Sequence, residues 1–287
     1  MPPPRSMEAS LVEQIASGQG CLRPVALVVA HPDDETLGLG SRLAALDRLK
    51  LIHLTDGSPR CLDDAESAGF VDDASYAAAR RRELDAALTA LGVRAERIAY
   101  GERDQETIKA LDRIVARLVG DLDGVDAVVT HPYEHGHPDH DTAALAVALA
   151  CRVRAARGQR VPERIEFASY HLRQGRPLYG VFWPDPERPE RRIDLNAAAL
   201  AQKRGAIDRH ASQRAVLEQI PLSPERLRVA PEHDFGAPAP PREGVYDGYG
   251  WEMTSERWRR IAAAAWRRSA QPPEDERWLA QARAAAR

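Results

Sequence analysis

The sequence is poor in cysteine and shows no segment typical of export. It contains three cysteines, Cys21, Cys61 and Cys151, and no two of them lie close together. This odd number and wide spacing argue against a disulfide framework and against a zinc site built from cysteines. Residues 1–20 contain prolines and charges but no apolar run, so we expect no signal peptide. Together these absences predict a cytoplasmic protein.

Long hydrophobic runs and an excess of one charge are also absent. The longest nearly apolar stretch, residues 143–153, is too short to cross a bilayer. With 40 basic and 43 acidic residues, the formal net charge is −3, which indicates neither a nucleic acid nor a membrane as a partner. We therefore expect a small-molecule partner, and the sequence leaves open whether the chain forms a homo-oligomer.

Strand and helix patterns alternate along the first half of the chain. Apolar runs typical of buried strands lie at 25–30, 51–55, 98–100 and 126–130, and helical patterns follow at 37–49, 76–91, 105–119 and 141–156. This order predicts an α/β protein in which a mostly parallel sheet carries helices on both faces. In a doubly wound sheet the core strand order would be 3-2-1-4, which makes the first and fourth strands neighbours.

The C-terminal half of the chain is less regular. We expect a strand at 164–172, a long helix at 197–220, and two short helices at 255–267 and 274–287. Residues 221–250 are rich in proline and glycine and predict a long surface loop. We interpret residues 1–287 as one domain, with a core at about 22–220 and irregular additions at 221–287.

Two short motifs rich in histidine and aspartate follow the first and fourth predicted strands. The first is Ala-His-Pro-Asp-Asp-Glu at residues 30–35, and the second is His-Gly-His-Pro-Asp-His-Asp at residues 135–141. The carboxyl ends of neighbouring parallel strands meet at one edge of a sheet, so both motifs should belong to one site. Imidazoles and carboxylates bind transition metals and transfer protons. The sequence therefore predicts a hydrolytic metalloenzyme.

The residue types indicate how such a site would work. A catalytic zinc ion commonly has three protein ligands and a fourth position for water. His31 and Asp34, three residues apart, can bind one ion, and His137 or His140 can supply the third ligand. Asp33 is a neighbouring carboxylate suited to take a proton from the water. Another histidine could stabilise the oxyanion and protonate the leaving group.

Both motifs resemble those of the LmbE-like, or PIG-L-like, zinc-dependent N-deacetylases. This family carries an Ala-His-Pro-Asp-Asp-Glu loop after the first strand and a His-Pro-Asp-His loop after the fourth, and both are uninterrupted here. Asp56-Gly57 resembles the family's Thr-Asp-Gly turn. The further matching positions, in two helical elements, are Arg80, Glu83, Leu91-Gly92, Lys203, His210, Ser212 and Gln213.

The resemblance implies a Rossmann-like three-layer sandwich and a role for each motif residue. It makes His31, Asp34 and His140 the ligands of one Zn²⁺ per chain. It makes Asp33 the general base and His137 the group that stabilises the oxyanion and acts as the acid, with Asp139 orienting His137. The positions that it relates to the substrate are Arg80, Asp104 and His135.

The function implied by the resemblance is removal of an N-acetyl, or another short N-acyl, group from an amino sugar or sugar conjugate such as an N-acetylglucosamine derivative. Two alternatives stay open: an amidase that acts on a larger thiol-sugar or glycoside conjugate, and a sugar-binding protein without catalytic activity. A site of histidines and an aspartate could also hold Fe²⁺, Co²⁺ or Mn²⁺.

Several polar and aromatic residues have structural interpretations. His53 lies in an apolar strand and is expected to be a hydrogen-bonded core residue, whereas His210 falls on a helix and is an even choice between packing and support of the site. For Tyr246, Tyr249 and Trp251 we favour packing slightly over stacking on a sugar. Gly38-Leu39-Gly40 lacks the third glycine of a dinucleotide-binding loop, which disfavours a nucleotide site.

Overall fold

The structure, a computed structural model, describes residues 10–59, 61, 63–240 and 242–269. Its centre is a sheet with the strand order β3-β2-β1-β4-β5-β9-β8. In that order the strands are β3 (Ala95–Glu102), β2 (Leu49–Thr55), β1 (Val25–Val29), β4 (Ala127–Thr130), β5 (Glu163–Phe167), β9 (Glu225–Val229) and β8 (Arg191–Ile193). The first five are parallel, and β9 runs antiparallel to both of its neighbours, β5 and β8. The predicted α/β class and 3-2-1-4 core are confirmed.

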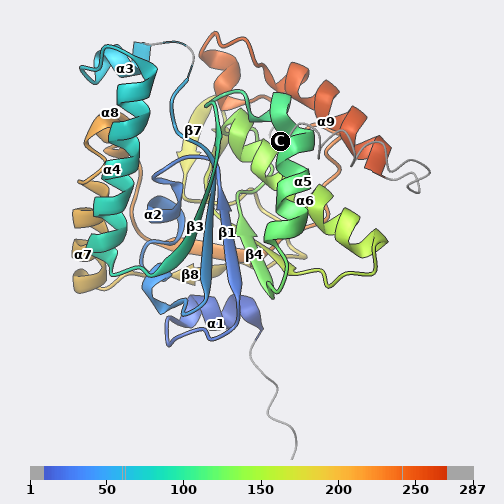
Figure 1. Ribbon diagram of the computed structural model, residues 1–287, viewed down its shortest axis with the longest axis horizontal. Helices are drawn as coiled ribbons and strands as arrows, with labels where there is room; N and C mark the ends of the chain where they lie inside the picture. Colours follow the sequence, from blue (N-terminus) through green and yellow to red (C-terminus); the bar gives the residue numbers. More distant parts are fainter. Residues whose placement is uncertain (1–9, 60, 62, 241, 270–287) are drawn as a thin grey trace, which may run out of the picture.

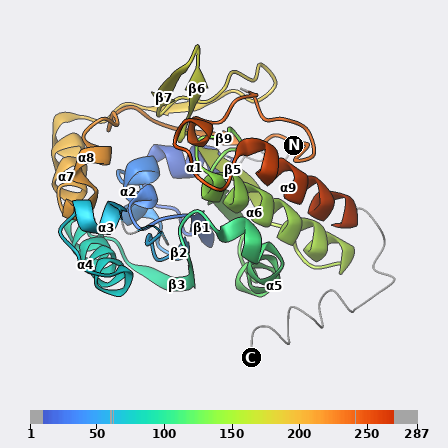
Figure 2. The same ribbon diagram turned by 90° about the horizontal axis from the view of Figure 1, so that it is seen from above.

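Helices cover both faces of this sheet (Figures 1 and 2). They are α1 (Leu11–Ser17), α2 (Asp34–Leu39), α3 (Asp63–Ser67), α4 (Asp73–Leu91), α5 (Leu111–Asp121), α6 (Pro138–Ala156), α7 (Ala197–Ile207), α8 (Arg214–Leu217) and α9 (Ser255–Ser269). Core residues of α5, α6 and α9 pack on one face, and those of α1, α2, α4 and α7 on the other. The layers match the predicted three-layer arrangement.

The central strand β1 explains why its sequence is an unbroken apolar run. Ala26 and Val28 point to the α5, α6 and α9 side, while Val25, Leu27 and Val29 point to the opposite side. All five side chains are fully buried. A strand buried on both faces needs apolar residues at every position, and this is the pattern of a central parallel strand.

The predicted helix at 37–49 was wrong. The chain instead forms the short helix α2 and a separate 3₁₀ turn, Leu43–Ala45. The Lys203 ammonium donates to the Leu37 carbonyl (2.6 Å), which satisfies the end of α2 from another helix. A Cβ on Gly38 would lie 2.2 Å from the Phe167 ring, so this glycine lets the sheet approach α2 closely.

Two other predicted helices are interrupted. The helix predicted at 105–119 consists of a 3₁₀ turn, Thr107–Ala110, followed by α5. The helix predicted at 197–220 consists of α7, a 3₁₀ turn at Ala211–Gln213 and α8. At this break, Glu83 of α4 accepts hydrogen bonds from the Ser212 backbone (2.9 Å) and hydroxyl (2.6 Å). These tertiary contacts compete with a continuous helix.

The segment expected to be a long surface loop contributes a buried strand. Strand β9 lies between β5 and β8, and its Leu227 is fully buried. The Arg228 guanidinium pairs with Glu166 of β5 at 2.9 Å, which satisfies two buried charges. Because charged residues alternate with apolar ones along β9, the sequence pattern did not indicate a strand in this proline-rich segment.

The strand predicted at 164–172 is in fact two strands in different sheets. Strand β5 ends at Phe167, and β6 (Tyr170–Arg173) pairs with β7 (Arg176–Tyr179) in a separate hairpin. Figure 2 shows this hairpin standing out from one edge of the molecule. The helix predicted at 255–267 is confirmed as α9, whereas the helix predicted at 274–287 lies outside the described residues. Within the described part, no helix is both long and apolar enough to cross a membrane.

Candidate active site

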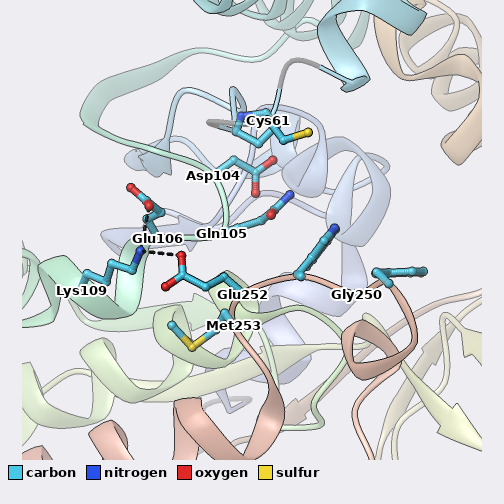
Figure 3. A pocket seen from close by; sticks show the side chains of 11 residues that line it. Cys61, Asp104, Gln105, Glu106, Lys109, Gly250, Glu252 and Met253 are labelled. Carbon is cyan, nitrogen blue, oxygen red and sulfur yellow. Dashed lines mark hydrogen bonds and ion pairs between the residues drawn. The ribbon is translucent and has the colours of Figure 1, made fainter.

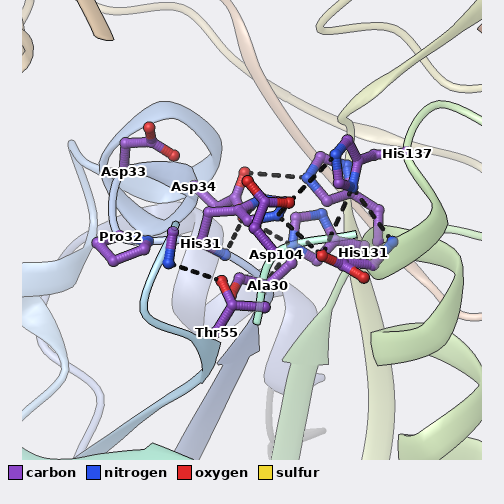
Figure 4. A network of polar contacts seen from close by, with 12 residues as sticks. Ala30, His31, Pro32, Asp33, Asp34, Thr55, Asp104, His131 and His137 are labelled. Carbon is purple, nitrogen blue, oxygen red and sulfur yellow. Dashed lines mark hydrogen bonds and ion pairs between the residues drawn. The ribbon is translucent and has the colours of Figure 1, made fainter. Parts of the chain in front are cut away.

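The two motifs meet at the carboxyl ends of β1 and β4, which are adjacent in the sheet. His31 lies two residues beyond β1, and His131 directly follows β4. Figure 4 shows side chains from both strand ends converging on one cluster. This is the crevice where the connections of a doubly wound sheet diverge.

Asp34 lies at the centre of the cluster. Its carboxylate is 3.3 Å from His31 Nδ1, 3.2 Å from His140 Nε2 and 3.3 Å from His131 Nε2. Asp34 is the first residue of α2, and His140 is in the first turn of α6. The structure thus brings together the three residues predicted as ligands, and it adds His131 to them.

The donor set suits a transition metal. Zinc bonds to nitrogen and oxygen ligands are about 2.0–2.1 Å long, so two ligands of a tetrahedral ion are separated by about 3.3 Å. The contacts of Asp34 with His31 and His140 have this separation. Donor atoms lie within 4.8 Å of one another in three groups, which are His31 with His137 and His140, His31 with Asp104, His137 and Asp139, and Asp34 with His131 and His140. The predicted ligands His31 and Asp34 fall in different groups, and His140 belongs to a group with each of them. The residues present therefore fit a metal ion.

His131 is held in a defined orientation beneath the cluster. Its Nε2 accepts the Ala30 backbone N–H (3.2 Å), so its Nδ1 carries the proton and donates to the Ser169 hydroxyl (2.9 Å). The ring stacks on His140 with 3.9 Å between centroids. Burial, with the neighbouring His140, lowers the pKa of His131 to about 3, which keeps the imidazole neutral.

Asp33 is held by Arg80 rather than by the histidines. The Arg80 Nη2 atom donates to Asp33 Oδ2 (3.0 Å) and to the Pro32 carbonyl (3.1 Å), and Nη1 donates to the Gly57 carbonyl (3.0 Å). A Cβ on Gly57 would lie 2.8 Å from the guanidinium carbon, which explains the glycine in this turn. Burial raises the pKa of Asp33 to about 7, although Arg80 opposes the shift.

The position of Arg80 differs from the expected substrate contact. Its side chain is 3% exposed, and its two terminal nitrogens are engaged with Asp33 and with backbone carbonyls. Arg80 therefore offers little surface to a substrate and instead fixes a neighbouring carboxylate. The Asp33 carboxylate and two backbone carbonyls accept from its terminal nitrogens, which offsets the cost of burying the charge.

His137 caps helix α6, and this contact separates it from the carboxylate of Asp139. His137 Nδ1 accepts the Asp139 backbone N–H (3.2 Å), whereas the Asp139 carboxylate is 4.0 Å from that nitrogen. The carboxylate instead lies 3.3 Å from His31 Nε2 and accepts from the Gln105 N–H (2.6 Å) and the Thr107 hydroxyl (2.5 Å). Asp139 thus contacts His31 more closely than His137, which the motif did not reveal.

Asp104 joins the cluster from the loop after β3. Its Oδ1 atom is 3.1 Å from His31 Nε2 and 3.6 Å from His137 Nε2. Burial would raise the pKa of Asp104, but the facing His31 holds it well below its usual range. The chain reaches this position by an irregular turn, which sequence periodicity could not have located.

His135, which the resemblance related to the substrate, is engaged with other parts of the chain. Its side chain is fully buried, its Nδ1 is 2.8 Å from Asp141 Oδ2, and its Nε2 accepts the Ala239 N–H (3.3 Å). The Tyr246 hydroxyl also donates to Asp141 (3.1 Å). With both ring nitrogens engaged, His135 joins the second motif to the C-terminal segment. Packing of Tyr246 was predicted and is confirmed by its complete burial.

The interpretations of the remaining histidines can also be compared with the structure. His53 is confirmed as a hydrogen-bonded core residue, since its Nε2 lies 3.0 Å from Glu35. His210 is buried, and burial lowers the pKa of its imidazole. The neighbouring Glu35 carboxylate opposes this shift. It contacts none of the three predicted ligands in the polar network described above.

Two aromatic residues lie beside the cluster. The Tyr170 ring lies 5.3 Å from that of His140, and the Trp251 ring lies 5.2 Å from that of His137. Tyr170 belongs to the β6–β7 hairpin, and Trp251 to the segment before α9. For Trp251 the sequence slightly favoured packing over stacking on a sugar, whereas Tyr170 was not singled out because it lay within a predicted strand.

A cavity of about 400 Å³ opens beside the cluster (Figure 3). Asp104 and Trp251 line it, and these residues also contact the two site histidines His31 and His137. The cavity lies between the loop after β3 and the segment before α9 (Figure 3). A small molecule in this cavity would therefore reach the His and Asp cluster.

The amino-acid sequence is similar to a known protein family and to a curated protein. Residues 26–151 match the family model described as "PIG-L: GlcNAc-PI de-N-acetylase". A probable N-acetyl-α-D-glucosaminyl L-malate deacetylase 2 of Bacillus anthracis is 34% identical over 137 residues, which are 45% of this chain and 59% of that protein. The chain thus matches somewhat more than half the length of this curated relative.

Solved structures share the fold. A triple mutant of a deacetylase in the teicoplanin biosynthetic pathway has a TM-score of 0.52 and 17% identity, covering 71% of this chain and 96% of its own. The zinc-inhibited form of a teicoplanin deacetylase has a TM-score of 0.50 and 17% identity, covering 73% and 99%. At this identity the likeness shows the fold alone.

Proposed function

Residues 26–151 are a PIG-L, or LmbE-like, family domain, and from this premise we propose that the protein is a metal-dependent N-deacetylase. Its substrate would be an amino sugar or sugar conjugate that carries an N-acetyl or another short N-acyl group. The name of the Bacillus anthracis relative supports this substrate class, because that protein is a probable deacetylase of an N-acetylglucosaminyl conjugate.

The observation that carries the proposal is the contact of one carboxylate with imidazoles from both motifs. Asp34 is within 3.3 Å of His31 and within 3.2 Å of His140. We propose that these three side chains hold one Zn²⁺ per chain, although Fe²⁺, Co²⁺ and Mn²⁺ accept the same donors. When bound, such an ion supplies a Lewis acid that polarises the acyl carbonyl and favours deprotonation of water.

Asp33 would be the general base. Its carboxylate is adjacent in sequence to Asp34, yet its hydrogen bond goes to Arg80 at 3.0 Å. A carboxylate beside the ligand set, but held by another group, is suited to take the proton of the attacking water. Arg80 would keep this carboxylate in one orientation while the proton is transferred.

His137 would donate to the oxyanion through Nε2–H. As it protonates the departing amine from this nitrogen, it would recover the proton that Asp33 has taken from the water, so that the imidazole ends neutral. The helix-cap contact supports this role, because Nδ1 accepts the Asp139 N–H and the proton of the neutral ring must be on Nε2. His137 Nε2 lies 3.6 Å from Asp104, so the proton is on the side of the cavity. Asp139 would orient His137 through its backbone N–H.

The proposal can be tested by measuring acetate release from N-acetylated amino sugars and their glycosides. We expect release by metal-loaded wild-type protein. Asp33→Asn should retain about one metal ion per chain but lose activity by about 10²- to 10⁴-fold, since it cannot accept the proton. Asp194→Asn is the matched control, because this exposed carboxylate lies on the loop after β8.

Near-normal turnover by Asp33→Asn would contradict its assignment as the base. If metal-loaded wild-type protein released no acyl group from any substrate, the deacetylase proposal itself would fail. Binding of amino sugars without turnover would then favour the sugar-binding alternative.

A further inference from the structure

The cavity beside the cluster has a wall that family resemblance does not cover. Tyr249 and Trp251 line it together with Asp104 and Lys109. Figure 3 shows Asp104 and Gln105 facing the segment that carries Gly250, Glu252 and Met253, with Lys109 joined to Glu252 by an ion pair. The Tyr249–Met253 segment lies outside residues 26–151, the part of the chain that matches the family model.

The aromatic pair on this wall is both exposed and close to the cluster. Tyr249 is 53% exposed, so part of its ring is accessible to a ligand. Its ring lies 4.9 Å from that of Trp251, at 50° between planes. Trp251 in turn contacts His137, with 5.2 Å between ring centroids. The pair therefore extends from the proposed acid to the open edge of the cavity.

Two further aromatic rings, on the β6–β7 hairpin, lie beside the cluster. The Tyr170 ring lies 5.4 Å from that of Tyr179 and 5.3 Å from that of His140. Aromatic rings from two separate segments thus border the two histidines His137 and His140. Flat apolar surfaces of this kind bind other rings by stacking.

The charges on the cavity wall oppose an acidic ligand. Among the described lining residues, the carboxylates are Asp104, Glu106 and Glu252, and Lys109 is the cation. Lys109 Nζ is already paired, at 2.8 Å from Glu106 Oε1 and 3.7 Å from Glu252 Oε2. A carboxylate on the ligand would therefore meet like charges without a cation ready to pair with it.

We propose that this cavity binds the aglycone of the substrate and that the aglycone is an uncharged ring which stacks on Tyr249 and Trp251. This inference rests on the proposed N-deacetylase function. An aryl group and a second sugar both offer an apolar face, and the test below distinguishes these two sources of the ring. The amide-bearing sugar would then be held at the His and Asp cluster.

The test compares kcat/KM for deacetylation of glycosides that differ only in the aglycone. The substrates are the methyl, 4-nitrophenyl and 4-carboxyphenyl glycosides of N-acetylglucosamine, together with N,N′-diacetylchitobiose. For wild type we expect the 4-nitrophenyl glycoside to exceed the methyl glycoside by about tenfold. The 4-carboxyphenyl glycoside keeps the ring but adds a charge, and should be about tenfold poorer than the 4-nitrophenyl glycoside.

The variants use the ratio of 4-nitrophenyl to methyl glycoside, which does not depend on the fraction of folded protein. In Tyr249→Ala this ratio should fall to about twofold, whereas Tyr249→Phe should retain it because the ring remains. Val216→Ala is the control, since Val216 is similarly exposed at 56% but lies on α8. It should keep the wild-type ratio.

The outcomes separate the two proposals. A wild-type ratio near one, or a ratio unchanged in Tyr249→Ala, would overturn the aglycone site even if deacetylation is observed. A larger kcat/KM for the chitobiose than for the methyl glycoside would support a second sugar as the ring. If no substrate is deacetylated, calorimetry can still test the aglycone site through binding of the 4-nitrophenyl glycoside. Tighter binding by wild type than by Tyr249→Ala would support the site, and equal binding would overturn it.

Discussion

At the scale of single residues, Asp34 organises the site. Burial would raise the pKa of its carboxyl group, but the facing imidazoles of His140 and His131 hold that pKa well below the usual range. The same carboxylate accepts the His31 backbone N–H at 2.7 Å, which orients it toward the rings. One side chain therefore joins both motifs and would contribute a charge to the metal.

We expect His140→Ala to lose the metal, because it removes one of three proposed ligands. Metal content measured after dialysis should fall from about one ion per chain to a small fraction of that. His233→Ala is the control, since His233 pairs with Glu166 outside the cluster. Unchanged metal content in folded His140→Ala protein would refute its role as a ligand.

At the scale of elements, two helices and a hairpin position the site. Helices α2 and α6 begin within the motifs, so Asp34 and His140 lie in first turns. The β6–β7 hairpin reaches the second motif because Gly136 has no side chain. A Cβ there would lie 2.1 Å from the Tyr170 carbonyl oxygen. Close approach at one glycine thus connects the hairpin with the second motif.

Gly136→Ala should destabilise the protein by about 1–3 kcal/mol, because the new methyl group overlaps backbone that cannot rotate away. Turnover should also fall as the hairpin and the second motif move apart. Gly205→Ala is a matched control, since Gly205 lies in α7 with no atom within 4 Å of an added Cβ. It should stabilise by up to about 1 kcal/mol. Urea unfolding would show both effects, and equal midpoints for the two variants would contradict the overlap.

At the scale of the whole molecule, a buried ion pair connects distant parts of the chain. Lys203 of α7 donates to Glu225 of β9 at 2.7 Å, and both side chains are 1% exposed. Lys203 also donates to the Leu37 carbonyl, and Glu225 accepts the Ser41 backbone N–H at 2.9 Å. This network joins the C-terminal half to the helix that carries Asp34.

Lys203→Met should lower the free energy of unfolding by about 3–5 kcal/mol, because it leaves a buried carboxylate without its cation. The double variant Lys203→Met with Glu225→Leu should lose less than the single variant, since neither charge remains. Arg97→Met, which breaks an exposed pair with Asp85, should change stability by less than about 1 kcal/mol. If the double variant lost as much free energy of unfolding as the two single variants together, the result would argue against energetic coupling of Lys203 and Glu225.

The amino-acid sequence was sufficient to predict the sheet core and the convergence of the motifs. A strand buried on both faces must be apolar throughout, so β1, β2 and β4 were visible as runs. Parallel neighbours share a carboxyl edge, so His31 and His140 could be assigned to one site. These properties follow from local pattern and topology, which the linear sequence contains.

The tertiary structure alone decided the strand β9, the hairpin and the partners of several charged residues. Strand β9 depends on Arg228 pairing with Glu166, and α2 ends where Lys203 reaches Leu37. Arg80 was assigned to the substrate, but the fold turns it toward Asp33. Such outcomes depend on contacts between segments far apart in sequence, because a buried charge must find a partner and a local pattern does not specify which one it meets.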